Sequence, residues 1–103
     1  MIRVFAYRQG GYYRLFVTGH ANYHAGEDIV CAGVSALCCS LAAYAKSSPN
    51  CRHLRCYVAP GEVFLACRGG LGAGFDTVVG GLAQIAASYP DHVRIEAAEG
   101  CRI

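Results

Sequence analysis

The sequence predicts a two-layer α+β domain, in which a mixed or antiparallel sheet of about five strands packs against two helices. Stretches with alternating apolar and polar residues, typical of half-buried strands, recur along the chain, and two longer apolar runs without that alternation are typical of helices. The 103 residues have the length of one domain, which we place at residues 1–103. A chain of this size buries roughly 65% of its unfolded surface, enough for a core without disulfides or metal.

The first half of the chain predicts a hairpin followed by a helix. Residues 2–8 alternate, and a glycine-containing turn leads to a second strand over residues 12–19. Asp28 is a good N-cap for an apolar helix that ends near Lys46, a few residues before Pro49.

The second half repeats a hairpin and a helix and adds a last strand, so that the element order is β-β-α-β-β-α-β. The expected elements are strands at 54–59 and 62–68 joined by a Pro-Gly turn, a flexible glycine-rich connector at 69–74, a helix at 77–88 capped by Asp76, and a strand at 92–97.

Composition excludes disorder and gives no sign of a strongly charged partner. Apolar residues make up 54% of the chain and charged residues 16%, the reverse of a disordered sequence. The formal net charge is only +2 and the basic residues are scattered along the chain, so we expect no direct contact with nucleic acid. We expect four tyrosines to pack on the sheet rather than to stack on bases: Tyr7, Tyr12, Tyr13 and Tyr57.

The chain opens as a strand and lacks the pattern of a signal peptide, so we expect a cytoplasmic protein with reduced thiols. Residues 29–45 form an uncharged run at the lower limit of a membrane span, and we expect a helix buried on two sides rather than contact with a membrane. One sheet face cannot cover a helix that is apolar nearly all round. We therefore expect this helix also to touch the second helix or a second copy in a homodimer.

The sequence holds seven cysteines, and an odd number argues against a closed disulfide framework. The segment from Cys51 to Cys56, with His53 between them, comes nearest to a metal-ligand pattern, but no C-x-x-C pair supports it, and we expect neither metal nor cofactor. Two cysteines in the first helix are expected simply to pack. Apart from that expectation, the sequence leaves open the roles of Cys38, Cys39, Cys51, Cys56, Cys67 and Cys101.

One cysteine stands where a helix is expected to begin. With Asp28 as N-cap, Cys31 falls in the first turn, where free backbone N–H groups and the positive end of the helix dipole favour a thiolate and could hold an oxyanion. His20 ends the second strand, from which a loop returns the chain to this helix, and could pair with the thiolate. Ser35 follows Cys31 by one turn and shares its face. These residues allow Cys–His catalysis, but a core cysteine and a loop histidine are also compatible with them.

The segment between residues 19 and 37 resembles the signature of the ribosomal-processing cysteine protease family, Prp. The order of elements agrees along essentially the whole chain, and a Tyr-Pro pair stands near the end of the second helix, as in that family. The matching parts of the signature are Gly19-His20-Ala21, a short loop with Gly26, and Asp28-Ile29-Val30-Cys31-Ala32, followed after one residue by Val34-Ser35-Ala36-Leu37.

The resemblance implies a cysteine endopeptidase that removes a short N-terminal extension from the twenty-seventh protein of the large ribosomal subunit through a thioester acyl-enzyme. It implies His20 as general base and Cys31 as nucleophile, and it implies an apolar, aromatic-rich peptide before the cleaved bond. It further implies a homodimer with a mobile loop over the active site. The supporting positions would be Asp28, Ser35 and Gly19, and the loop positions that meet substrate would be Asn22, Tyr23, His24 and Gly26.

Two alternatives stay open. His24 is a second imidazole in the loop, and spacing alone does not decide between it and His20 as the base. The alternative function is a non-catalytic, dimeric binding module associated with the ribosome, in which Arg52 and Arg55, beside Lys46, contact RNA phosphates.

Overall fold

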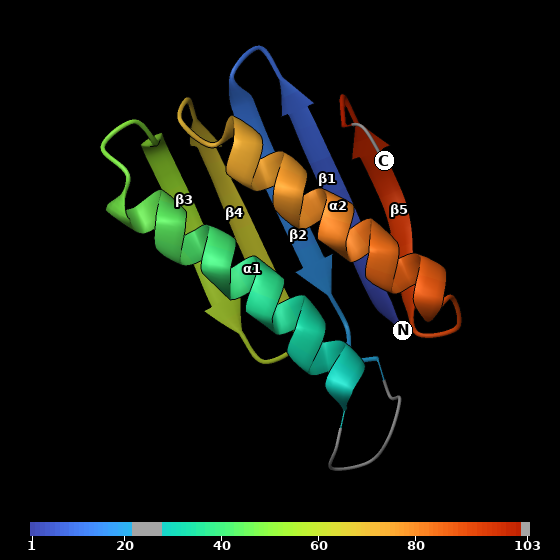
Figure 1. Cartoon of the computed structure of the whole chain (residues 1–103). Helices are drawn as coiled ribbons and strands as arrows, with labels where there is room; N and C mark the ends of the chain where they lie inside the picture. Colours follow the sequence, from blue (N-terminus) through green and yellow to red (C-terminus); the bar gives the residue numbers. More distant parts are fainter. Residues whose placement is uncertain (22–27, 102–103) are drawn as a thin grey trace.

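The computed structural model describes residues 1–21 and 28–101, and these form five strands and two helices in the predicted order (Figure 1). The elements are β1 (Ile2–Gln9), β2 (Tyr12–Thr18), α1 (Ile29–Ser47), β3 (Arg52–Ala59), β4 (Glu62–Arg68), α2 (Gly72–Ser88) and β5 (Val93–Glu99).

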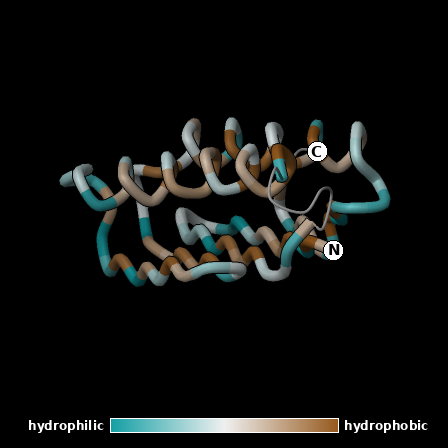
Figure 2. Tube along the Cα trace, turned by 90° about the horizontal axis from the view of Figure 1, so that it is seen from below, coloured by the Kyte–Doolittle hydropathy of each residue, from teal (hydrophilic) through white to brown (hydrophobic). Residues whose placement is uncertain are grey.

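The strands form one sheet in the order β3-β4-β2-β1-β5. The two hairpins and the β2–β4 pair are antiparallel, and β5 runs parallel to β1, so the sheet is mixed. Both helices lie side by side on one face of the sheet, and the edge-on view shows one layer of helices over one layer of strands (Figures 1 and 2). The predicted two-layer α+β architecture is confirmed.

The core lies between these layers, and the alternation of the strands creates it. In β1, Ile2, Val4 and Ala6 are buried while Phe5 between them is 37% exposed. Successive strand side chains point to opposite faces, so every second residue meets the helices. The largest fully buried side chains are Phe75, Leu15, Leu65, Leu71, Leu82, Val4, Val30, Val79, Val93, Cys38 and Cys67.

Helix α1 begins as predicted, directly after Asp28, whose side chain caps it. It is the one helix among the described residues that is long and apolar enough to cross a membrane by length and composition, a test that core helices also pass. Its buried side chains include Val30, Val34 and Leu41, which belong to the core. The expected contact with the second helix is confirmed, because Gly81 of α2 lies against the Leu37 side chain.

Helix α2 begins at Gly72 and not at residue 77, so the expected flexible connector over 69–74 is wrong in its second half. Burial explains the earlier start, because Leu71 and Phe75 are both 0% exposed and anchor the first turn in the core. Asp76 does not cap the helix. Its carboxylate instead forms an ion pair with Arg8 of β1.

Strand β3 begins at Arg52, two positions before the predicted start. An irregularity in its pairing with β4 lies between Arg52 and Arg55, where His53 adopts a positive φ of 54°. A break in alternation of this kind hides the first residues of a strand from sequence analysis.

All seven cysteines are free thiols. Within residues 1–21 and 28–101, no three His, Cys, Asp or Glu side chains come together in a way that could hold a metal ion.

Candidate active site

A cavity of about 240 Å³ opens where α1 begins. The end of β2 contributes Gly19 and His20 to its lining, and α1 contributes Cys31 and Ser35. The opposite wall is the β3–β4 turn, residues 58–63, which the sequence did not link to the site. The structure therefore brings four of the five predicted catalytic and supporting residues to one cavity, and the fifth, Asp28, caps the helix at its edge.

Two backbone N–H groups fix the position of Cys31. Its own N–H donates to Asp28 Oδ1 at 2.9 Å, the bond of an N-cap, which holds the first turn of α1 in place. The N–H of Ala21 donates to Cys31 Sγ at 3.2 Å. Ala21 is only 1% exposed, while Cys31, which accepts this hydrogen bond, lines the cavity.

His20 reaches the cavity through a sharp turn at Gly19. Gly19 has a φ of 102°, and a Cβ there would lie 2.2 Å from the Met1 carbonyl oxygen, so only glycine fits. The Gly19 N–H donates to the Gly61 oxygen at 2.9 Å. The His20 ring lies against Gly61, because a Cβ at that position would be 2.6 Å from Nε2. Among the described residues, no hydrogen bond joins the His20 ring to Cys31 Sγ.

The surroundings of Cys31 oppose the expected resting thiolate. Burial raises the pKa of the Cys31 thiol above its ordinary value, and the Asp28 carboxylate raises it further, while the Ala21 N–H lowers it. The first two effects prevail, so the neutral thiol is favoured at neutral pH. The N-cap that places Cys31 near the helix dipole thus also brings a negative charge close to the sulfur.

Cys39 joins Cys31 and Ser35 along one face of α1, at intervals of four residues, and lines the same cavity. It is exposed, whereas its neighbour Cys38 is 1% exposed in the core and has a pKa raised to about 12 by burial. Packing is therefore confirmed for Cys38 but not for Cys39. The predicted loop positions Asn22, Tyr23, His24 and Gly26 lie outside the described residues.

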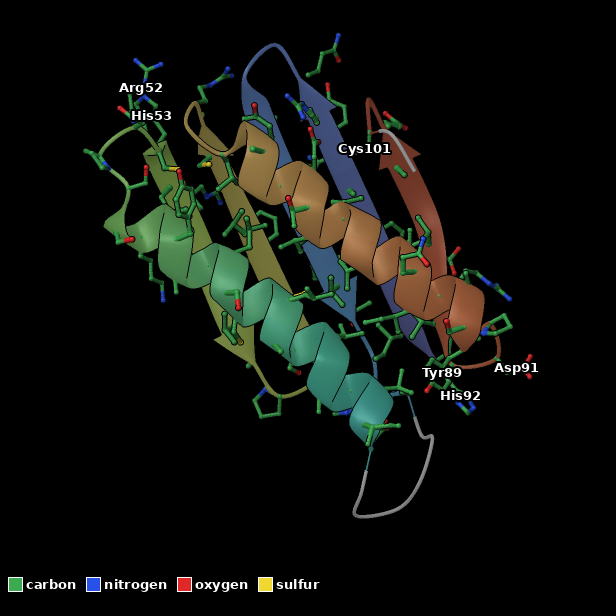
Figure 3. The ribbon with its side chains drawn as sticks, in the orientation of Figure 1. Arg52, His53, Tyr89, Asp91, His92 and Cys101 are labelled. Carbon is green, nitrogen blue, oxygen red and sulfur yellow. The ribbon has the colours of Figure 1, made fainter. Side chains whose placement is uncertain are left out.

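Sequence analysis missed His92, which precedes β5. Its Nδ1 lies 2.8 Å from the Ala21 oxygen, the carbonyl of the residue whose N–H contacts Cys31 Sγ. Its backbone oxygen accepts a hydrogen bond from the Ile2 N–H at 2.8 Å. Figure 3 shows His92 beside Tyr89, at the end of the sheet where α1 begins. No local pattern around residue 92 signals this contact, because it joins positions 71 residues apart.

A thiol in the first turn of a helix, facing a cavity that it shares with an imidazole, is the kind of site found in cysteine hydrolases. The model of one protein family, cysteine protease Prp, matches residues 1–94. The chain therefore belongs to the Prp family, and it is a cysteine protease.

Solved structures support the same fold. The S. aureus essential ribosomal processing protease Prp, in complex with a covalently linked product peptide, superposes with a TM-score of 0.76 at 23% identity, over 94% of this chain and 99% of that one. The same protease with a substrate peptide gives 0.71 at 22% identity, over 94% and 99%. SMU.848 from Streptococcus mutans gives 0.71 at 23% identity, over 96% and 95%. No curated protein matches the sequence.

Proposed function

We propose that this chain is a ribosomal-processing endopeptidase, which removes an N-terminal extension from the twenty-seventh protein of the large ribosomal subunit. Cys31 is the nucleophile and His20 the general base. The observation that carries the proposal is that His20 and Cys31, which come from different elements, line one open cavity. The S. aureus relative, a ribosomal processing protease with bound substrate and product peptides, supports the substrate class. A homodimer and a cytoplasmic location stay predictions.

The mechanism starts from a neutral thiol, in keeping with the raised pKa of Cys31. Sγ attacks the scissile carbonyl carbon while His20 takes the thiol proton, and an S–C bond forms. The imidazolium then gives this proton to the leaving nitrogen, the C–N bond breaks, and a thioester remains. Water, deprotonated by His20, attacks the thioester and releases the acid product and the thiol.

The oxyanion needs donors close to the sulfur. The Cys31 and Ala32 N–H groups already donate to Asp28, to its side chain at 2.9 Å and its backbone oxygen at 3.0 Å. The Ala21 N–H lies 3.2 Å from Sγ and is better placed, because it can donate to the oxyanion instead of to Sγ once Sγ is bonded to the substrate carbon. We assign Ala21 N–H as an oxyanion donor, held in place by the contact of its carbonyl with His92.

The walls of the cavity favour an apolar substrate side chain. Val34 of α1 and Val58, Pro60 and Val63 of the opposite hairpin line it. Apolar side chains leave water readily for such a surface, at roughly 25 cal/mol for each Å² removed from water. This lining supports a substrate extension that is apolar before the cleaved bond.

The test is cleavage of the extended ribosomal protein by the full chain, followed by mass spectrometry of the products. Cys31→Ala should abolish cleavage and leave the circular dichroism spectrum unchanged. The matched control is Cys101→Ala, because Cys101 is a half-buried thiol at the far end of the sheet (Figure 3). This variant should cleave the substrate normally. Cleavage by Cys31→Ala at the unmodified rate would refute Cys31 as the nucleophile. If the unmodified chain leaves this protein intact but cleaves another apolar peptide, the substrate assignment fails and the site assignment stands.

A further inference from the structure

The face of the sheet that points away from the helices carries a row of aromatic side chains. Tyr57, Phe64, Phe16 and Phe5 are paired neighbours across β3, β4, β2 and β1. The ring centroids of Phe64 and Phe16 lie 6.5 Å apart, and those of Phe16 and Phe5 lie 6.0 Å apart. Tyr57 is 56% exposed and Phe5 37%. Both helices cover the opposite face, so this row, which spans roughly 14 Å, is open to solvent (Figure 2).

Four exposed arginines lie beside the aromatic row on the same face. In the next row across the sheet, Arg55 and Arg14 both pair with Ala66. In the row after that, Arg52 and Arg68 are paired neighbours. Among the described residues, none of these four guanidinium groups forms an ion pair.

Two of these arginines also stack on tyrosines. The Arg14 guanidinium lies 5.2 Å from the centroid of the Tyr7 ring, and that of Arg68 lies 5.2 Å from the centroid of the Tyr12 ring. Such stacking holds the charged groups over the face and leaves their outward N–H donors free for a ligand.

One carboxylate of this face lies close to Arg14, and the others are paired or lie in another row. Glu96 on β5 contacts Arg3 and Arg94, at 3.8 and 3.7 Å. Glu62 lies in the row on the other side of the aromatics. Glu99 on β5 stands in the row of Arg14 and lines a hollow together with it. With four arginines against the one carboxylate of Glu99, this part of the face carries a net positive charge.

Charge complementarity decides which partner fits such a surface. An apolar peptide would leave the four guanidinium groups without partners. In a two-fold contact with a second copy, this positive face would meet itself. A single nucleic-acid strand satisfies both features, because bases stack on aromatic rings and phosphates accept hydrogen bonds from arginine.

We propose that this face, formed by the Tyr57–Phe64–Phe16–Phe5 row and the four arginines beside it, binds single-stranded RNA. The choice of RNA over DNA rests on the proposed ribosomal substrate, since binding to the ribosome would hold the protease near it. The proposal departs from the sequence-based expectation of no contact with nucleic acid. Residues that are scattered along the chain become neighbours only through the pairing of the strands.

The experiment measures binding of a short fluorescent oligouridylate to the full chain by anisotropy. Tyr57→Ala should weaken binding about tenfold or more, because one base no longer has a ring to stack on, whereas Tyr57→Phe should restore it. The matched control is Tyr44→Ala: Tyr44 is 51% exposed on α1, and the variant should bind as the unmodified chain does. The double variant Arg14→Ala, Arg68→Ala should weaken binding and reduce the slope of log K against log salt concentration by about 1.4, because each phosphate that is no longer neutralised lowers it by about 0.7. Lys46→Ala, on the helix layer, should leave the slope unchanged.

Peptide cleavage separates this proposal from the proposed function. Tyr57→Ala should cleave substrate normally, which also shows that it folds, and Cys31→Ala should bind RNA normally. The RNA-binding proposal fails if the unmodified chain does not bind oligouridylate, or if Tyr44→Ala weakens binding as much as Tyr57→Ala does. It fails as well if Tyr57→Ala dissociates a dimer in sedimentation and leaves RNA binding unchanged, which would assign the face to a second copy.

Discussion

The two hairpin turns of this protein, at opposite ends of the sheet, each hold a glycine at a positive φ but have different neighbours. Gly11 in the β1–β2 turn has a φ of 80°, and Gly61 in the β3–β4 turn has a φ of 74°. A Cβ on Gly11 would meet nothing within 4 Å, whereas one on Gly61 would meet the His20 ring. One turn closes a hairpin, and the other also forms a wall of the cavity that holds the proposed active site. A sequence shows that both are turns, but only the tertiary structure shows which of them carries function.

The largest effect on activity is expected for Gly61→Ala, and its comparison with Gly11→Ala separates the structural role of a turn from a role in the site. Both Gly61→Ala and Gly11→Ala put an L side chain at a positive φ, which costs each about 1–2 kcal/mol of the free energy of unfolding. Only Gly61→Ala also displaces His20, an exposed side chain that moves rather than unfolding the protein. We expect kcat/KM for the peptide to fall roughly tenfold or more in Gly61→Ala, because a small misplacement of a catalytic group can cost up to about a hundredfold. Gly11→Ala should keep its activity at temperatures where it is folded.

A double-mutant cycle tests the physical reason. If Gly61→Ala acts through His20, it should cause little further loss of kcat/KM in a His20→Ala background. Equal losses of kcat/KM in Gly61→Ala and Gly11→Ala would mean that neither turn has a special role in cleavage, and that the position of His20 does not depend on the β3–β4 turn.

The charge beside Cys31 provides the next test, with an effect on reactivity rather than on the fold. The Asp28 carboxylate helps raise the pKa of the Cys31 thiol, so at neutral pH a smaller fraction is thiolate than in a free thiol. Asp28→Asn removes this charge, and asparagine caps helices about as well as aspartate. The pKa should therefore fall, and alkylation of Cys31 by iodoacetamide at pH 7 should become faster.

The alkylation rate should be followed across pH for each variant by mass spectrometry of the peptide that contains Cys31. In the unmodified chain, the rate should keep rising above the ordinary pKa of a thiol, and in Asp28→Asn the curve should shift to lower pH. Asp91→Asn, at an exposed carboxylate after α2, is the control and should leave the curve in place. A shift to higher pH in Asp28→Asn would show that the carboxylate stabilises the thiolate, contrary to the structure.

Local signals were enough to predict the start of α1. The Asp28 cap and the position of Cys31 in the first turn depend on residues three apart, and both are confirmed. The ionisation state of Cys31 was not predictable in the same way, because desolvation depends on everything packed around the sulfur, and the cap itself carries the opposing charge. The same local pattern thus predicted the position of Cys31, but it did not show the burial and the charge that oppose a thiolate there.

Contacts between distant segments account for what the sequence could not show. The start of α2 is set by the burial of Leu71 and Phe75 under the rest of the core, which outweighs the glycines around them. The contact of His92 with Ala21 joins positions 71 residues apart, and the aromatic row on the open sheet face forms only by strand register. In each case the residues are plain in the sequence, but their neighbours are not.

The smallest effect is expected at the end of the sheet away from the proposed active site. There Arg8 pairs with Asp76 at the start of α2 and lies over the Tyr13 ring. Arg8→Ala removes a partly exposed ion pair and a cation–π contact, both weak in water. The urea midpoint should fall by less than in Gly11→Ala, and the difference from the unmodified chain should shrink at high salt, because ions screen the pair. Peptide cleavage should not change. A loss of cleavage in folded Arg8→Ala would mean that the two ends of the sheet are coupled, and that the division between a structural end and a catalytic end is wrong.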